Sequence, residues 1–180
     1  MSEELRLIDA AKAGSVGAFT ELVGRYKDGL LRFLVTRCAS VADAEDALQD
    51  TMINAYRYLK SYDPRWRFST WLYRIAIRNA ARQRRDSYAD IDDVADEESD
   101  PLEACIDASE RENLWITAKR LFNDDVYTAM WLRYVEDMSI NDVAAALERS
   151  GSWTKVNLMR ARKALDAELN TQGAESEAYG

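Results

Sequence analysis

The chain has 180 residues, a formal net charge of −8, 47% hydrophobic residues and 31% charged residues. It contains no histidine, which excludes a histidine general base, a histidine metal ligand and a histidine pH switch. With only two prolines and seven glycines, the composition favours an all-α protein over a sheet protein.

The cysteines and the N-terminal segment bear on the compartment. Cys38 and Cys105 belong to no CxxC pair, so neither a zinc site nor a disulfide framework is indicated. The first residues are acidic and amphipathic rather than a signal peptide, and no run approaches the roughly 18 apolar residues of a membrane span. We therefore expect a cytoplasmic protein with no cofactor, no metal and no membrane contact.

Charge is unevenly distributed along the chain. Residues 64–85 carry seven arginines and residues 149–165 carry five basic residues, and neither segment contains an acid. Residues 86–112 lie between them and hold twelve acids against Arg111 alone. The net charge argues weakly against a free-standing DNA-binding protein, but this average conceals two basic segments that flank an acidic one.

Hydrophobic spacing predicts four helices in the first half of the chain, over about residues 2–14, 15–38, 40–61 and 69–86. Ser2, Ser40 and Ser69 are the expected N-caps of the first, third and fourth helices. Pro64 disfavours helix at Asp63 and marks a break within the segment SYDPRWRF.

The second half begins after a loss of periodicity. Residues 87–107 are acidic and contain Pro101, as is typical of a solvated linker. Ser139 and Ser152 are the expected caps of the last two helices, and residues 170–180 are predicted to be disordered. We therefore expect two small helical domains, residues 1–86 and 108–169, joined by an acidic flexible linker. The helices of the second domain are predicted at about 108–121, 124–136, 139–148 and 153–169.

The segment SINDVAAALERSGSWTKVNLMRARKAL has the layout of a helix-turn-helix. A short alanine-rich helix is followed by a turn and a longer basic helix, and Ala144 and Ala145 allow the close crossing that this motif needs. The second helix of such a motif can enter a DNA major groove. The alternative is a helical hairpin with no DNA-binding role.

An arginine and tryptophan stripe runs along the fourth predicted helix. Trp71, Arg74, Arg78, Arg82 and Arg85 are spaced three or four residues apart and share one face. Guanidinium groups contact phosphates and tryptophan can stack on an unpaired base, so the stripe suits single-stranded or melted nucleic acid. The alternative is a solvated arginine face with tryptophans in the core.

Acidic residues share a face of the third predicted helix. Asp43, Asp46 and Asp50 are aligned there, with Glu45 and Gln49 adjacent. They are compatible with stabilising the helix N-terminus, with docking on a basic partner helix, or with gathering a metal for phosphoryl chemistry. The metal is the least favoured of these because no second carboxylate cluster is evident.

Taken together and in this order, these segments resemble the extracytoplasmic-function group of the bacterial sigma-70 family, over about residues 5–86 and 108–168. The resemblance implies a two-domain transcription initiation factor that binds core RNA polymerase, directs it to promoters, helps to melt them and has no catalysis of its own. The matching segments are AFTELVGRYKDGLLRFL, DAEDALQDTMINAYRYL, FSTWLYRIAIRNAARQRR, WLRYVEDMSINDVAAAL and TKVNLMRARKAL.

The resemblance also implies where the chain meets its partners. A coiled coil of the largest polymerase subunit would bind Asp46, Gln49 and Asp50. The SYDPRWRF loop would hold a base flipped out of the non-template strand of the minus-ten element. The implied minus-ten contacts are Arg65, Trp66, Arg67, Phe68, Trp71, Arg74, Arg78, Asn79 and Arg82. The implied minus-thirty-five contacts on duplex DNA are Ser152, Trp153, Lys155, Asn157, Arg160 and Arg162.

Further implications concern regulation and the linker. Members of the family are commonly held inactive by an anti-sigma protein, so such a partner is expected, and the acidic linker would thread the polymerase channel that later carries RNA. The chain departs from the family pattern in having Glu148 where a glycine usually follows Leu147, and in the residues that open its last helix. These departures affect which promoter is read and whether Trp153 packs in the domain or faces DNA.

Two other functions remain open from the sequence. A helix-turn-helix regulator would bind duplex operators without touching polymerase, and it would need neither the acidic face nor the arginine and tryptophan stripe. A metal-dependent nuclease would use Asp43, Asp46 and Asp50, but the lack of histidine and of a second carboxylate cluster makes it remote.

Overall fold

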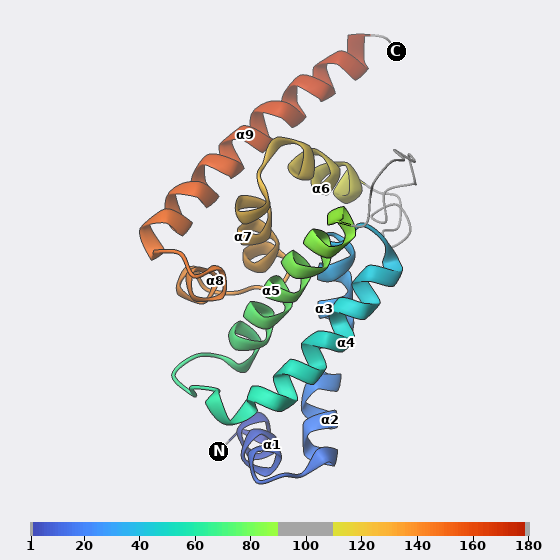
Figure 1. The fold of residues 1–180 in the computed structure, drawn as a ribbon. Helices are drawn as coiled ribbons and strands as arrows, with labels where there is room; N and C mark the ends of the chain where they lie inside the picture. The colour runs from blue at the N-terminus through green and yellow to red at the C-terminus, as the bar shows by residue number, and fades with distance from the viewer. Residues whose placement is uncertain (1, 90–109, 179–180) are drawn as a thin grey trace. The chain divides into compact units, whose positions relative to one another are not determined.

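The computed structural model describes residues 2–89 and 110–178, and every regular element within these two ranges is helical (Figure 1). This agrees with the predicted all-α fold. The chain divides into two compact units, Met1–Cys105 and Ile106–Gly180. Most of the predicted acidic linker, residues 90–107, lies outside the described residues.

The first unit begins with short helices, although the sequence predicts one long helix over residues 15–38. The segment 15–38 forms two helices, separated at Arg25 and Tyr26, because Gly24 is a poor helix former and Tyr26, with φ −109° and ψ −12°, departs from the dihedral angles of a regular helix. This break lets both helices face one core, and Leu22 and Leu30 are fully buried. The helices of this part are α1 (Glu3–Lys12), α2 (Val16–Gly24) and α3 (Lys27–Val35).

Two long helices build the rest of the first unit: α4 (Val41–Tyr58) lies along α5 (Phe68–Ala89), and α3 contacts both (Figure 1). Buried alanines allow the close approach of α4 and α5. The 3-10 turn η1 (Leu59–Ser61) extends α4 to the position where the predicted helix ends. The buried small residues of the two helices are Ala44, Ala47 and Ala55 on α4, and Ala76 and Ala80 on α5.

The helix starts test the predicted caps. The Ser40 hydroxyl accepts a hydrogen bond from the Asp43 N–H at 3.1 Å, and Ser2 likewise caps α1, so both predictions are confirmed. Ser69 is not an N-cap, because α5 already starts at Phe68 and Ser69 is buried in its first turn. Helix α5 also continues to Ala89, so the predicted linker does not begin at residue 87.

The second unit contains α6 (Glu110–Leu121), α7 (Asp124–Tyr134), α8 (Ile140–Leu147) and α9 (Gly151–Ala178). Ser139 caps α8 as predicted, with its hydroxyl accepting from the Asp142 N–H at 3.1 Å. The cap of α9 is Ser150 rather than Ser152, because the Trp153 N–H donates to Ser150 Oγ at 3.1 Å. Helix α9 continues to Ala178, so the prediction of a disordered tail from residue 170 is wrong.

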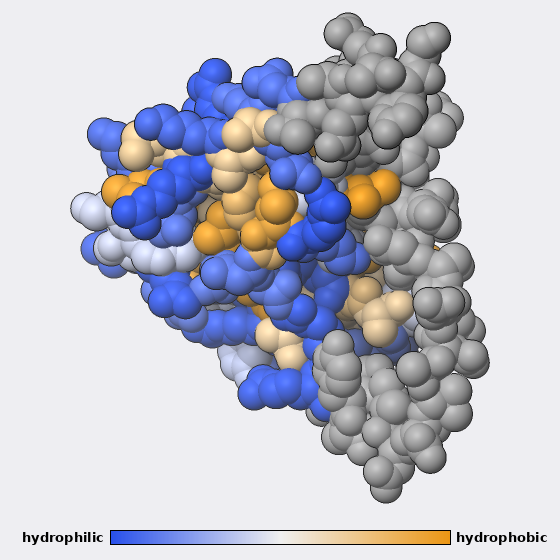
Figure 2. Space-filling view, turned by 90° about the horizontal axis from the view of Figure 1, so that it is seen from above, coloured by the Kyte–Doolittle hydropathy of each residue, from blue (hydrophilic) through white to orange (hydrophobic). Residues whose placement is uncertain are grey.

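On the face drawn in Figure 2, hydrophilic residues predominate and hydrophobic ones gather in small patches between them. Among the residues that the structure describes, no helix is both long enough and apolar enough to span a membrane.

Candidate nucleic-acid interfaces

The loop between η1 and α5 is held in one conformation by polar contacts. The Tyr62 hydroxyl donates to the Trp66 carbonyl oxygen at 2.6 Å, and the Lys12 ammonium donates to the Tyr62 carbonyl oxygen at 3.0 Å. The same ammonium lies 5.2 Å from the centre of the Tyr62 ring, within range of a cation–π interaction. These contacts close the loop on itself and attach it to α1.

An aromatic cluster supports this loop from inside. Phe68 is only 1% exposed, and its ring centroid lies 5.5 to 5.7 Å from those of Tyr26, Tyr62 and Trp71. The predicted DNA contact at Phe68 is therefore a core position, because its ring is surrounded by other aromatic rings. Its role here is to hold Tyr62 and Trp71 in place.

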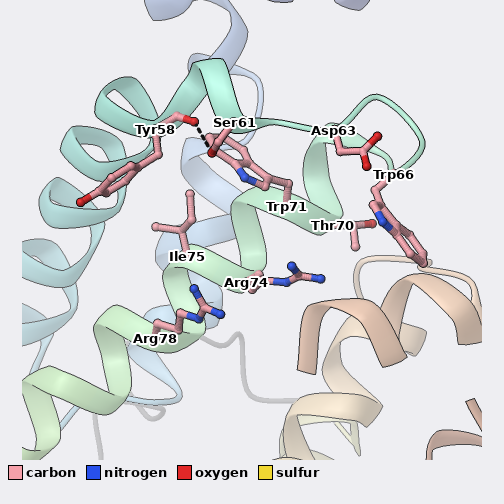
Figure 3. A pocket seen from close by; sticks show the side chains of 9 residues that line it. All are labelled: Tyr58, Ser61, Asp63, Trp66, Thr70, Trp71, Arg74, Ile75 and Arg78. Carbon is pink, nitrogen blue, oxygen red and sulfur yellow. Dashed lines mark hydrogen bonds between the residues drawn. The ribbon is translucent and has the colours of Figure 1, made fainter. Parts of the chain in front are cut away.

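A pocket of about 440 Å³ opens between the loop and α5 (Figure 3). Arg74 and Arg78 lie on successive turns of α5 at its edge, and Trp66 is 40% exposed in the loop opposite. Four predicted contacts meet at this pocket, namely Trp66, Trp71, Arg74 and Arg78. Of the other five lining residues, Ser61 and Asp63 belong to the predicted SYDPRWRF loop. The sequence did not identify the remaining three, which are Tyr58, Thr70 and Ile75.

An ion pair stiffens the exposed side of the loop. The Arg65 Nε donates to Asp63 Oδ2 at 2.7 Å, and the Arg65 backbone N–H donates to Asp63 Oδ1 at 3.0 Å. These hydrogen bonds lower the pKa of Asp63 below its ordinary value and raise the pKa of Arg65. The predicted contacts Arg65 and Arg67 are exposed beside the pocket but do not line it.

Two predicted DNA contacts on α5 face α4 instead. Asn79 is 7% exposed; its amide nitrogen donates to Thr51 Oγ1 at 3.1 Å and its amide oxygen accepts from Asn54 Nδ2 at 3.2 Å. The prediction that Asn79 flanks the pocket is therefore wrong, since both ends of its amide join α5 to α4. Arg82 forms an ion pair with Asp50 of α4, and both side chains are partly exposed.

The acidic face of α4 contains three predicted polymerase contacts. Asp46 and Gln49 are exposed, whereas Asp50 is half-buried and paired with Arg82. Within the described ranges, no group of three or more histidine, cysteine or acidic residues could hold a metal ion. Asp43, Asp46 and Asp50 therefore do not form the metal site that a nuclease would require.

The helix-turn-helix of the second unit is formed by α8 and α9. Its turn begins at Glu148, which has the left-handed backbone conformation with φ 57° and ψ 38°. Arg149 then pairs with Asp125 of α7 and its guanidinium lies 5.3 Å from the centre of the Trp153 ring. Trp153 is half-buried under this arginine, so part of its ring packs in the second unit and part is exposed.

The predicted duplex contacts occupy more than one side of α9. Thr154, Leu158 and Ala161 form its buried side. The Asn157 amide donates to the Trp153 carbonyl oxygen at 2.9 Å within the same helix. The remaining predicted contacts are exposed, and these are Ser152, Lys155, Arg160 and Arg162.

The all-helical fold, with a helix-turn-helix in its second unit, is typical of a class of DNA-binding proteins. Residues 22–97 match the family described as Sigma-70 region 2. The ECF RNA polymerase sigma-E factor of Escherichia coli (strain K12) is 31% identical over 92% of this chain and 95% of its own length. The RNA polymerase sigma-H factor of Pseudomonas aeruginosa is 30% identical over 93% of this chain and 94% of its own length.

Solved structures show the same fold. CnrH, solved in complex with the cytosolic domain of CnrY, has a TM-score of 0.71 and 25% identity, covering 94% of this chain and 99% of CnrH. The sigma factor RpoE of Bartonella quintana, solved with the anti-sigma factor NepR, has a TM-score of 0.68 and 21% identity, covering 86% and 98%. This chain belongs to the sigma-70 family, in its extracytoplasmic-function group. It is a transcription initiation factor rather than a regulator of duplex operators, and its family is not a class of enzymes.

Proposed function

We propose that this chain binds core RNA polymerase, directs it to promoters and helps to open them, and that it has no catalytic activity of its own. Residues 1–86 would dock on polymerase and bind the minus-ten element, and residues 108–169 would bind the minus-thirty-five element, with the residues that follow the end of α5 at Ala89 linking the two. A cytoplasmic location follows from this role, because core polymerase and promoter DNA are there.

The observation that carries the proposal is the pocket between the 62–67 loop and α5. Its volume of about 440 Å³ accommodates a nucleobase, and Trp66 and Trp71 offer aromatic faces for stacking. Arg74 and Arg78 lie at its edge, where phosphates flanking an extruded base would run. A base enters such a pocket only after leaving the duplex stack, so binding favours the melted state.

Polymerase docking is proposed for the exposed acidic side of α4. Asp46 and Gln49 are exposed on neighbouring turns and are available to a basic partner such as a coiled coil of the largest polymerase subunit. Asp50 would join this surface if a partner cation replaced Arg82. An anti-sigma protein would compete for the same surfaces, as the anti-sigma factor NepR is the partner of the sigma factor RpoE in its solved complex.

The pocket is tested by removing single bases from the non-template strand of a promoter bound by the reconstituted holoenzyme. We expect one minus-ten position at which loss of the base weakens the wild-type complex by about 5-fold to 100-fold, as for loss of one base stack. Trp66→Ala should remove the sensitivity at that position. Tyr134→Ala, which changes an exposed aromatic residue of α7, is the matched control and should keep it. Equal sensitivity in wild type and Trp66→Ala would contradict the pocket assignment.

Docking is tested by co-purification with core polymerase. Asp46→Arg should abolish the complex because it places a cation against a basic partner, while circular dichroism shows an unchanged helical fold. Asp28→Arg, at an exposed acid on α3, makes the same charge change elsewhere and should leave the complex intact. Unchanged binding of Asp46→Arg would remove α4 from the docking surface.

A further inference from the structure

Two large apolar side chains are exposed on α9 among cations. Val156 is 38% exposed and Met159 is 53% exposed, and their spacing of three residues makes them neighbours on the helix surface. The buried side of α9, which includes Thr154, Leu158 and Ala161, faces away from them. Neither residue therefore belongs to the core of the second unit, although hydrophobic residues on a helix are ordinarily read as core.

The surroundings of this pair indicate what covers it. Ser152 and Lys163 continue the same stripe of α9, Lys155 and Arg160 flank it, and residues 149–165 contain no acid. Two apolar side chains flanked by cations are too small a patch for a stable protein interface, which needs a larger apolar centre. A polyanion with small apolar groups at regular positions matches both the charge and the size of the stripe.

The DNA major groove is such a polyanion. It presents the C5-methyl group of thymine beside hydrogen-bonding base edges, and apolar side chains contact that methyl. The first turns of the second helix of a helix-turn-helix face the base edges, and Val156 and Met159 lie within the first three turns of α9. Polar side chains on the same helix then contact phosphates and other base edges.

We propose that Val156 and Met159 are specificity-determining residues that read thymine methyl groups in the duplex element bound by α9. The inference rests on the proposed function, which places α9 in a major groove, and it adds the chemical group that this chain selects there. It also revises the set of reading residues, because Asn157 bonds to its own helix while the two apolar residues face outward.

The test uses the full chain in holoenzyme with core polymerase. A preferred upstream duplex is selected from a randomised library, and each thymine in it is replaced in turn by deoxyuridine, which lacks only the methyl group. We expect one or two positions where deoxyuridine weakens binding about fourfold, the effect of withdrawing one methyl-sized group from contact. Val156→Ala and Met159→Ala should each abolish the thymine preference at one position.

Lys155→Ala is the matched control on the same helix. It should weaken thymine and deoxyuridine duplexes equally and reduce the dependence of binding on salt, as expected for a phosphate contact. A selected duplex that shows no deoxyuridine effect, or an effect that survives in both alanine variants, overturns the inference and leaves the proposed function standing. A holoenzyme that forms but selects no upstream duplex overturns both.

Discussion

The two candidate DNA surfaces differ in shape and in what supports them. The pocket of the first unit is concave and is held by buried aromatic rings, whereas α9 of the second unit presents a convex stripe of exposed side chains. A concave aromatic pocket suits a base that has left the stack, and a convex helix suits an intact groove. Under the proposed function, each unit would therefore bind one state of the promoter, melted or duplex.

The largest expected effect tests the dependence of the pocket on the core. Phe68→Ala should lower the free energy of unfolding of the first unit by about 3–5 kcal/mol, because it removes a fully buried ring that contacts three others. Urea unfolding followed by tryptophan fluorescence measures this loss. Met159→Ala removes a large side chain from the convex stripe and should change the stability of the second unit by less than about 0.5 kcal/mol. Similar losses of unfolding free energy in both variants would show that the two surfaces depend equally on the cores of their units.

Local sequence patterns predicted most of the helices but only part of the pocket. The caps at Ser40 and Ser139 were predictable because a cap bonds within three residues. The prediction of a cap at Ser152 was wrong because Ser150 forms the cap two residues earlier. Both serines satisfy the same local pattern. Such errors at helix ends are local and do not alter the fold.

The site residues show a different limit of sequence reasoning. Spacing on one helix placed Trp71, Arg74 and Arg78 together, and the structure brings these three to one pocket. Asn79 lies on the same helix, but its partners are on α4, and a tertiary contact leaves no mark in the periodicity of α5. Tyr58 could not be assigned to the pocket from the sequence for the same reason, because it reaches the pocket from the end of α4.

A smaller effect on stability is expected at the turn between α8 and α9 in the second unit. Glu148 has φ 57°, a conformation that disfavours residues other than glycine, and the family usually has a glycine here. Glu148→Gly should therefore raise the free energy of unfolding by about 0.5–1 kcal/mol, measured by thermal unfolding. Asp137, with φ 49°, is the matched control: aspartate tolerates this region better, and Asp137→Gly also loses an exposed ion pair with Arg133. The increase in unfolding free energy from Asp137→Gly should therefore be smaller. An equal or larger increase would contradict strain at Glu148.

The smallest expected effect concerns the rim of the pocket. Hydrogen bonds from Arg65 hold the pKa of Asp63 below its ordinary value, so the ionised carboxylate favours the folded loop. This contribution is fully present above the pKa of Asp63 in the unfolded chain, and it is lost as pH falls through the lower pKa of the folded state. An NMR titration of the Asp63 carboxyl should show the lowered pKa in the wild type. Arg65→Ala should raise the pKa of Asp63 most of the way back to its ordinary value, while the charge of Lys12 still lowers it slightly. A carboxyl pKa that is the same in both proteins would mean that the ion pair does not order the loop in solution. The convex stripe of α9 has no acid between residues 149 and 165, so acidification should perturb the pocket rim before it perturbs that stripe.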